Sequence, residues 1–432
     1  MDTPATGRLR ALDGLRFAAA AAVVAFHFTS RASPAWGQDV RQVFPRLSHI
    51  TAYGGFGPYL FFMISGFVVL RSAWGRPVHA FVASRVGRLF PAYWIAVVLT
   101  AAVLLFDPIM PVWHDLGMPG VALNLTMFQQ AFGVGHVDGV YWTLWIELKF
   151  YALIAVVALV GMTRRRILAL CLCWPVLGAL AAQAQAGLLT SLLEPTYAPF
   201  FCLGMLVYLV RRDGWTAGVV LLMGLNYGFA VWTSGTFYLR WAADVTQTPA
   251  SLPKIVILMT GCLGALLLVT VTPVARLEWR WLTTVGALTY PLYLVHEFPG
   301  WVMIKHLSPH LSPYLTLLVV VTAALVVSAA IQRLVERPLG GRLRAAVERD
   351  LAGALPARAT LRPAEARSDG PLTPSVEDTV ARTVPTGDRF APVEGPARRP
   401  GPLVPAAVRE PVPRKPARRH GEHPVDGRVD AR

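Results

Sequence analysis

Charge is scarce in this chain. Only 15% of its 432 residues are charged, against about a quarter in an average soluble domain, and 54% are hydrophobic. The mean hydropathy is +0.48. These values exclude a soluble cytosolic protein, and the length excludes a simple anchor peptide. Because apolar runs of membrane-spanning length recur along the chain, the composition predicts an all-α polytopic membrane protein.

Cysteine pairs and nucleotide-binding loops are also missing. The four cysteines lie in apolar runs, without a CxxC pair or metal-ligand spacing, so we expect inert apolar residues and no metal. The absence of a Walker loop argues against a nucleotide-driven pump, and we expect no bound cofactor. The first apolar run ends at Phe28 without a small-residue cleavage site, so we do not expect a removable signal peptide.

The charges between the apolar runs predict how the chain crosses the bilayer. With a cytoplasmic N-terminus, the inner segments hold 14 Arg and Lys residues and the outer segments hold six. This positive-inside pattern predicts ten spans with both termini in the cytoplasm. It also accounts for the net charge of +15 without a nucleic-acid partner. The expected spans are 12–30, 53–71, 90–106, 141–161, 167–186, 196–210, 215–233, 255–272, 281–304 and 314–332.

The composition changes sharply near Arg333. The last 100 residues hold 15 of the 34 prolines and a single aromatic residue, Phe390. Such a segment buries too little apolar surface to offset its ordering entropy. We therefore expect a transmembrane domain over 1–340 and a disordered Pro/Arg-rich cytoplasmic tail over 341–432. The start of the tail, Leu339 to Leu351, has the composition to extend the last helix.

Ionisable side chains inside the expected spans are few, and such residues are usually functional. A rise of ~1.5 Å per residue places His27 and His296 each ~22 Å from the inner face, with Glu147 also in the outer half. We infer one polar site at that depth. His27 is the best candidate for a general base, because imidazole titrates near neutral pH. The alternative is a histidine that only hydrogen-bonds to a neighbouring helix. The full set is Asp13, Arg16, His27, Glu147, Lys149, His296 and Glu297.

Three arginines near the inner face form a candidate phosphate site. Arg85 and Arg88 are three residues apart, so they share a helix face, and paired guanidinium groups suit phosphate. Arg16 lies eleven residues before His27, at the same end of the bundle. The alternative is that all three are ordinary positive-inside residues.

Five short blocks stand in a fixed order along the chain. They are Leu12–Arg16 followed by His27 (Arg-x10-His), Leu60–Phe67 (LFFxxSGF), Phe81–Pro91 (RxxR), Tyr141–Tyr151 (WxLxxExxFY) and Leu288–His296 (SYxLYLxH). Together they resemble the motifs of the acyltransferase family 3 membrane proteins, over roughly residues 8–340. The resemblance implies a ten-span helical domain. Its implied activity is transfer of an acyl group, usually acetyl, from acyl-coenzyme A to a hydroxyl of a sugar, glycan, lipid or small natural product.

The resemblance also assigns roles to individual residues. It implies that His27 is the essential catalytic residue, that Glu147 lies near the reaction centre, and that Arg16, Arg85 and Arg88 serve the acyl-donor site. Two departures matter. Many relatives have an acidic or polar residue where this chain has Tyr59, which puts a role for an acid there in doubt. Many also carry a C-terminal hydrolase-like domain, whereas this tail has no GxSxG-like block.

The leading hypothesis is a stand-alone O-acyltransferase of the bacterial inner membrane. Its partners are the lipid bilayer, acyl-CoA as co-substrate and a hydroxyl-bearing glycan or small molecule. In this hypothesis His27, oriented or charge-balanced by Glu147, acts as general base, and an acyl-histidine is the less favoured variant. Ser65, Tyr151 and His296 are candidates for the substrate site. The alternative is a proton-coupled transporter or flippase, because intramembrane His and Glu also relay protons.

Overall fold

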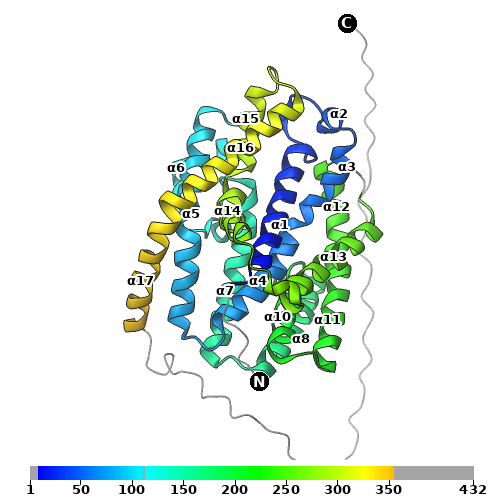
Figure 1. The fold of residues 1–432 in the computed structure, drawn as a ribbon, viewed down its shortest axis with the longest axis vertical. Coiled ribbons are helices and arrows are strands. Elements are labelled where there is room, and N and C mark those ends of the chain that lie inside the picture. The colour runs from blue at the N-terminus through cyan, green and yellow to red at the C-terminus, as the bar shows by residue number, and fades with distance from the viewer. Residues whose placement is uncertain (1–7, 110–111, 247, 249, 355–432) are drawn as a thin grey trace, which may run out of the picture. The chain divides into compact units, whose positions relative to one another are not determined.

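The computed structural model describes residues 8–109, 112–246, 248 and 250–354. In that part of the chain every regular element is a helix (Figure 1). Nine helical segments among these residues are long and apolar enough to cross a membrane. The all-α polytopic fold predicted from the sequence is therefore confirmed. The nine segments are Arg10–Thr29, Leu47–Ala73, Val78–Phe106, Gly139–Val160, Arg164–Gln183, Gly187–Asp213, Ala217–Thr246, Leu252–Val271 and Pro313–Ala354.

Figure 1 labels the α-helices within these segments and between them. The long ones are α1 (Arg10–Thr29), α4 (Gly57–Ala73), α5 (Val78–Phe106), α7 (Trp142–Val160), α8 (Arg164–Gln183), α10 (Ala198–Asp213), α11 (Ala217–Phe229), α13 (Leu252–Val271), α14 (Arg280–Val295), α16 (Pro313–Ile331) and α17 (Arg337–Ala354). The shorter ones are α2 (Val40–Val43), α3 (Leu47–Thr51), α6 (Val112–Asn124), α9 (Gly187–Leu193), α12 (Thr236–Thr246) and α15 (Glu297–Leu307). Two π-helical segments, Ala230–Gly235 and Gln332–Glu336, join α11 to α12 and α16 to α17.

The ninth predicted span, 281–304, is interrupted. It forms α14 and α15, which meet at His296. Pro299 explains the break, because proline has no N–H to donate to the carbonyl of Val295 and its ring clashes with that carbonyl in a continuous helix. Pro299 lies in the first turn of α15, where the N–H of any residue would have no partner within the helix, so the missing N–H costs nothing there. His296 and Glu297 therefore lie at a helix junction and not in the middle of a span.

The helix α5 begins well before its predicted apolar run. The run was expected over 90–106, but the helix starts at Val78. The first turns were missed because Arg85 and Arg88 interrupt the apolar pattern. Both arginines lie within the helix, and their spacing puts them on one face, as predicted.

The last helix also extends beyond its predicted limit. The extension expected over Leu339–Leu351 is confirmed, since α17 continues through Ala354 and packs against α5. Helical chain therefore passes the predicted domain boundary at residue 341. The rest of the predicted tail, residues 355–432, lies outside the described residues. The orientation with both termini in the cytoplasm stays a prediction.

Glycines let the central helices approach closely. The helix α4 packs against α10, and α1 packs against α14. A Cβ atom on Gly66 would meet the backbone of Phe201, and one on Gly204 would meet the backbone of Met63. Gly286 has the same function between α14 and α1. Lipid supplies no hydrophobic force between helices, so close van der Waals packing of this kind holds them together.

We predict that Gly204→Ala destabilises the protein, because the added Cβ cannot fit against the α4 backbone. Overpacking of a tight interface costs about 1–3 kcal/mol or more. Gly224→Ala in α11 is the matched control, since a Cβ there meets nothing within 4 Å. Thermal unfolding of both variants in detergent should show a lower midpoint for Gly204→Ala alone. Equal midpoints would contradict the packing described for α4 and α10.

Candidate active site

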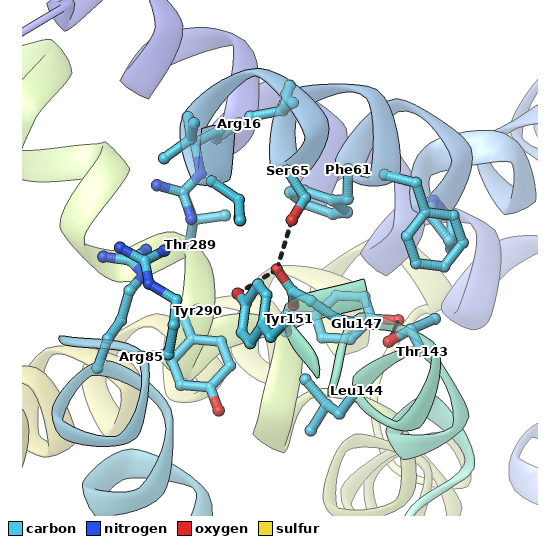
Figure 2. Close-up of a pocket in the computed structure, with 17 residues that line it drawn as sticks. Arg16, Phe61, Ser65, Arg85, Thr143, Leu144, Glu147, Tyr151, Thr289 and Tyr290 are labelled. Carbon is cyan, nitrogen blue, oxygen red and sulfur yellow. Dashed lines mark hydrogen bonds between the residues drawn. The ribbon is translucent and has the colours of Figure 1, made fainter. Parts of the chain in front are cut away.

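A cavity lies between α1, α4, α5, α7 and α14 (Figure 2). Its volume is about 710 Å³ when the open space at its mouth is included. Most of the side chains singled out from the sequence line it, although they come from distant parts of the chain. These are Arg16, Ser65, Arg85, Arg88, Glu147 and Tyr151. The other two candidates, His27 and His296, are not among its lining residues.

One end of the cavity is cationic. Arg16 from α1 and the Arg85/Arg88 pair from α5 converge there, as Figure 2 shows for the two labelled arginines. The Nε atoms of Arg16 and Arg85 are buried and have no hydrogen-bond partner among the described residues. The carboxylates near these guanidinium groups are Glu147, Glu336 and Asp13, and Asp13 forms an ion pair with Arg8. Buried guanidinium N–H groups without partners are suited to bind an anion.

Glu147 lies in the cavity beside this cationic end. Its Oε1 atom accepts hydrogen bonds from the Ser65 hydroxyl at 2.8 Å and from the Tyr151 hydroxyl at 2.5 Å (Figure 2). Tyr151 is four residues after Glu147 on α7, so the two share a face of the helix. Ser65 and Tyr151 thus fix the carboxylate, which faces the space where a ligand would lie.

The other end of the cavity is aromatic and leads towards the two histidines. The hydroxyl groups of Thr143 and Tyr293 are 2.9 Å apart, and the ring centroids of Phe61 and Tyr293 are 5.7 Å apart. The Tyr293 ring is also next to the imidazole of His296, with 5.9 Å between the ring centroids. Tyr293 therefore contacts both the cavity and the histidine cluster.

His27 and His296 belong to a buried polar cluster at the C-terminal ends of α1 and α14. The Nδ1 atom of His27 is 2.9 Å from Nε2 of His296. On its other side, Nε2 of His27 is 3.2 Å from Arg31 Nη1 and 3.5 Å from Glu297 Oε1. Arg31 and Glu297 form an ion pair of 2.7 Å. His27 is only 6% exposed, and His296 and Glu297 are fully buried, so this cluster is shielded from solvent.

Asp138 stabilises the helix junction that carries this cluster. Its carboxylate accepts hydrogen bonds from the N–H of Phe298 at 3.3 Å and from that of Val140 at 3.2 Å. Both N–H groups lie in the first turn of a helix, where a backbone N–H otherwise has no partner. Burial raises the pKa of Asp138, and the neighbouring Glu297 carboxylate raises it further. The second cause reflects how close the two acidic side chains lie at this buried junction.

The structure brings the two histidines together but does not place Glu147 against them. Among the described residues, Glu147 makes no hydrogen bond or ion pair with His27. The expectation that Glu147 orients or charge-balances His27 therefore does not fit the structure. The acidic side chain that lies beside His27 is Glu297. The physical reason is position. Glu147 faces α4 and the cavity near Arg16, which precedes His27 by eleven residues on α1, whereas Glu297 lies beside His27.

Two residues of the cluster were missed in the sequence. Arg31 was counted as an outer-loop charge, and it does lie just past the end of α1, but its side chain reaches back to Nε2 of His27. Asp138 precedes a short 3-10 turn and caps it, a local pattern that is recognisable in sequence.

Anywhere in the described ranges, no three His, Cys, Asp or Glu side chains converge into a group that could hold a metal ion.

Comparisons with known proteins identify the family. A protein-family model described as an acyltransferase domain matches residues 9–333. The chain belongs to this acyltransferase family. It is 28% identical over 369 residues to a Komagataeibacter xylinus protein described as a membrane-bound transacylase, BcsY, covering 76% of this chain and 82% of that protein. No solved structure matches it significantly.

A second relative is matched over a shorter region of the acyltransferase. It is the acyltransferase MdmB of Streptomyces mycarofaciens, 32% identical over 155 residues. The match covers 34% of this chain and 38% of MdmB. The resemblance recognised in the five sequence blocks is therefore confirmed, and the protein is a multi-pass membrane acyltransferase.

We predict that Arg31→Met destabilises the acyltransferase, because it leaves the buried Glu297 carboxylate without its cationic partner. Such a loss costs about 3–5 kcal/mol, and the lower end applies because 24% of the Arg31 side chain is exposed. The double variant Arg31→Met/Glu297→Gln removes both charges and should recover at least half of the loss. Thermal unfolding in detergent measures Arg31→Met, Glu297→Gln and the double variant. If the stability lost in the double variant equals the sum of the losses in the two single variants, the result would contradict the ion pair.

Proposed function

We propose that this acyltransferase moves an acyl group, most simply acetyl, from acyl-CoA to a hydroxyl of a sugar, envelope glycan or small natural product. The membrane is proposed to be the bacterial inner membrane. The observation that carries the proposal is the cavity itself. It has a cationic end with unpartnered guanidinium nitrogens and an aromatic end adjoining a buried histidine pair.

The shape and charge of the cavity suit coenzyme A as the donor. Coenzyme A has phosphate groups at one end, an amide-containing arm in the middle and the thioester at the other end. Arg16, Arg85 and Arg88 offer N–H donors to phosphate. Glu147 lies where the arm would pass, and its carboxylate is able to accept an amide N–H. The acyl end then lies towards Phe61 and Tyr293, and the Tyr293 ring is next to that of His296.

His27 is the proposed general base. It takes the proton of the acceptor hydroxyl while the hydroxyl oxygen attacks the thioester carbonyl carbon. The tetrahedral intermediate then collapses, the C–S bond breaks, and the imidazolium returns the proton to the departing thiolate. Glu297, 3.5 Å from Nε2 of His27, stabilises the transient positive charge. Atoms and charge balance without a metal or a redox cofactor in this scheme.

We predict that His27→Ala abolishes acyl transfer in cells. Loss of a general base costs about 10²–10⁴-fold in rate. A deletion strain, its parent and strains complemented with each variant should be compared by mass spectrometry of envelope glycans and small metabolites. One product, heavier by one acyl unit, should disappear in the deletion strain and in the His27→Ala strain. It should return with wild type and with the control His310→Ala, whose imidazole is exposed. Full product from inserted His27→Ala protein would refute the mechanism.

We also predict that Arg85→Ala and Arg88→Ala weaken coenzyme A binding. Each lost charge-assisted hydrogen bond costs about 1.5–3 kcal/mol, or roughly 10–100-fold in Kd. Binding to purified protein is measured by titration with coenzyme A and with pantetheine, which lacks the phosphates. The ratio of the two Kd values should shrink in the variants and stay unchanged in Arg76→Ala, a control at an exposed arginine near the start of the same helix. Unchanged ratios in both variants would exclude phosphate binding by this pair.

A further inference from the structure

We propose that His296 is a positioning residue that holds His27 in the tautomer with the proton on Nδ1, so that Nε2 is the basic nitrogen. The inference rests on the proposed function of His27. It gives His296 a different role from the substrate contact expected from the sequence.

The hydrogen-bond directions follow from the acceptor groups. The Nδ1 atom of His296 is 2.9 Å from the carbonyl oxygen of Tyr293 and 3.1 Å from that of Leu292. A carbonyl oxygen only accepts, so Nδ1 of His296 must carry a proton and donate. In the neutral ring, Nε2 of His296 is then an acceptor. The His27 Nδ1 atom, 2.9 Å away, must donate to it, which leaves the basic lone pair of His27 on Nε2, the atom that lies 3.2 Å from Arg31 Nη1.

The surrounding charges favour a neutral His296. Only one proton fits between two imidazole nitrogens 2.9 Å apart. A proton on Nε2 of His296 would reverse this bond and force the proton of His27 onto its other nitrogen. It would also add positive charge beside Arg31 in a buried cluster where Glu297 is already paired with Arg31. Such a charge is costly without a further partner.

The packing fixes both rings. His296 is fully buried at the junction of α14 and α15, with the rings of Phe28 and Tyr293 centred 6.2 Å and 5.9 Å from its own. The His27 backbone is held from the other side, because Trp301 Nε1 donates to its carbonyl at 2.9 Å. An imidazole held at its backbone and at Nδ1 presents Nε2 in one direction, towards Arg31 and Glu297.

The proton balance separates the roles of the two histidines. The hydroxyl proton moves to Nε2 of His27 and from there to the thiolate, while the Nδ1 proton of His27 stays on its hydrogen bond to His296. The Nδ1 proton of His296 stays on its own nitrogen, in the hydrogen bonds to the carbonyl oxygens of Leu292 and Tyr293. His296 therefore exchanges no proton in the reaction and acts only through the orientation and tautomer of His27.

Two substitutions test this role. His296→Phe keeps a ring of similar size but removes the acceptor, whereas His296→Gln places an amide oxygen near the former Nε2 position. The proposal predicts that His296→Phe lowers kcat by about 10²-fold, since the base loses its fixed tautomer, with KM for acyl-CoA within about twofold. His296→Gln should stay within about tenfold of the wild-type kcat.

The tautomer is also measurable directly in the wild-type protein. In histidine labelled with ¹⁵N and ¹³C, the one-bond correlation from Cδ2 reports on Nε2 alone. A solid-state spectrum in lipid bilayers at neutral pH, minus that of His27→Ala, isolates His27. We expect an unprotonated Nε2. This measurement decides the question even if His296→Phe does not fold.

The possible failures are distinct. A protonated Nε2 on His27, or equal kcat values for wild type and His296→Phe, would overturn the positioning role while leaving His27→Ala inactive. Equal loss of kcat in the Phe and Gln variants, with both folded, would also overturn it, because the acceptor would then not matter. Full activity of His27→Ala would instead overturn the proposed function on which the inference rests.

Discussion

The interruption of the helix at His296 is the constraint on which the rest of the site depends. A helix that ends within a bilayer leaves its last carbonyl groups without partners, and hydrocarbon offers none. Here Nδ1 of His296 reaches the carbonyls of Leu292 and Tyr293, at 3.1 Å and 2.9 Å. On the far side of the break, Asp138 accepts from the N–H of Phe298. The hydrogen bonds that make the break tolerable are therefore the same ones that orient the imidazole.

The charged groups are divided between two places, which keeps them available for different tasks. At the cavity, Glu147 accepts from the neutral hydroxyls of Ser65 and Tyr151, so it does not use up the guanidinium N–H groups nearby. At the histidine cluster, Arg31 and Glu297 neutralise each other. A single merged cluster would pair acids with bases and leave neither an anion site nor a free imidazole nitrogen. On the proposed mechanism, the separation serves both donor binding and proton transfer.

The sequence predicts the spans well because length and hydropathy dominate in a bilayer, and the helical rise places His27 and His296 at one level, where they do meet. It fails for Glu147, which faces α4 and the cavity near Arg16 and does not contact His27. Counting residues gives an approximate level along a helix, whereas the partner of a side chain depends on which helices are neighbours. Arg31 was missed for a related reason, since a charge after an apolar run is assigned to a loop even when its side chain reaches back to His27. The motifs give residue types, and only packing gives partners.

On the proposed mechanism, the position of Arg31 also bears on specificity. Its Nη1 atom lies 3.2 Å from Nε2 of His27, where an acceptor hydroxyl would have to approach. The base is therefore covered until an acceptor displaces that contact. A water molecule brings few interactions to offset the displacement, whereas an acceptor with several polar groups brings many. The same arrangement that leaves Nε2 basic thus limits wasteful hydrolysis of the thioester, because the base becomes available only when the correct alcohol has bound.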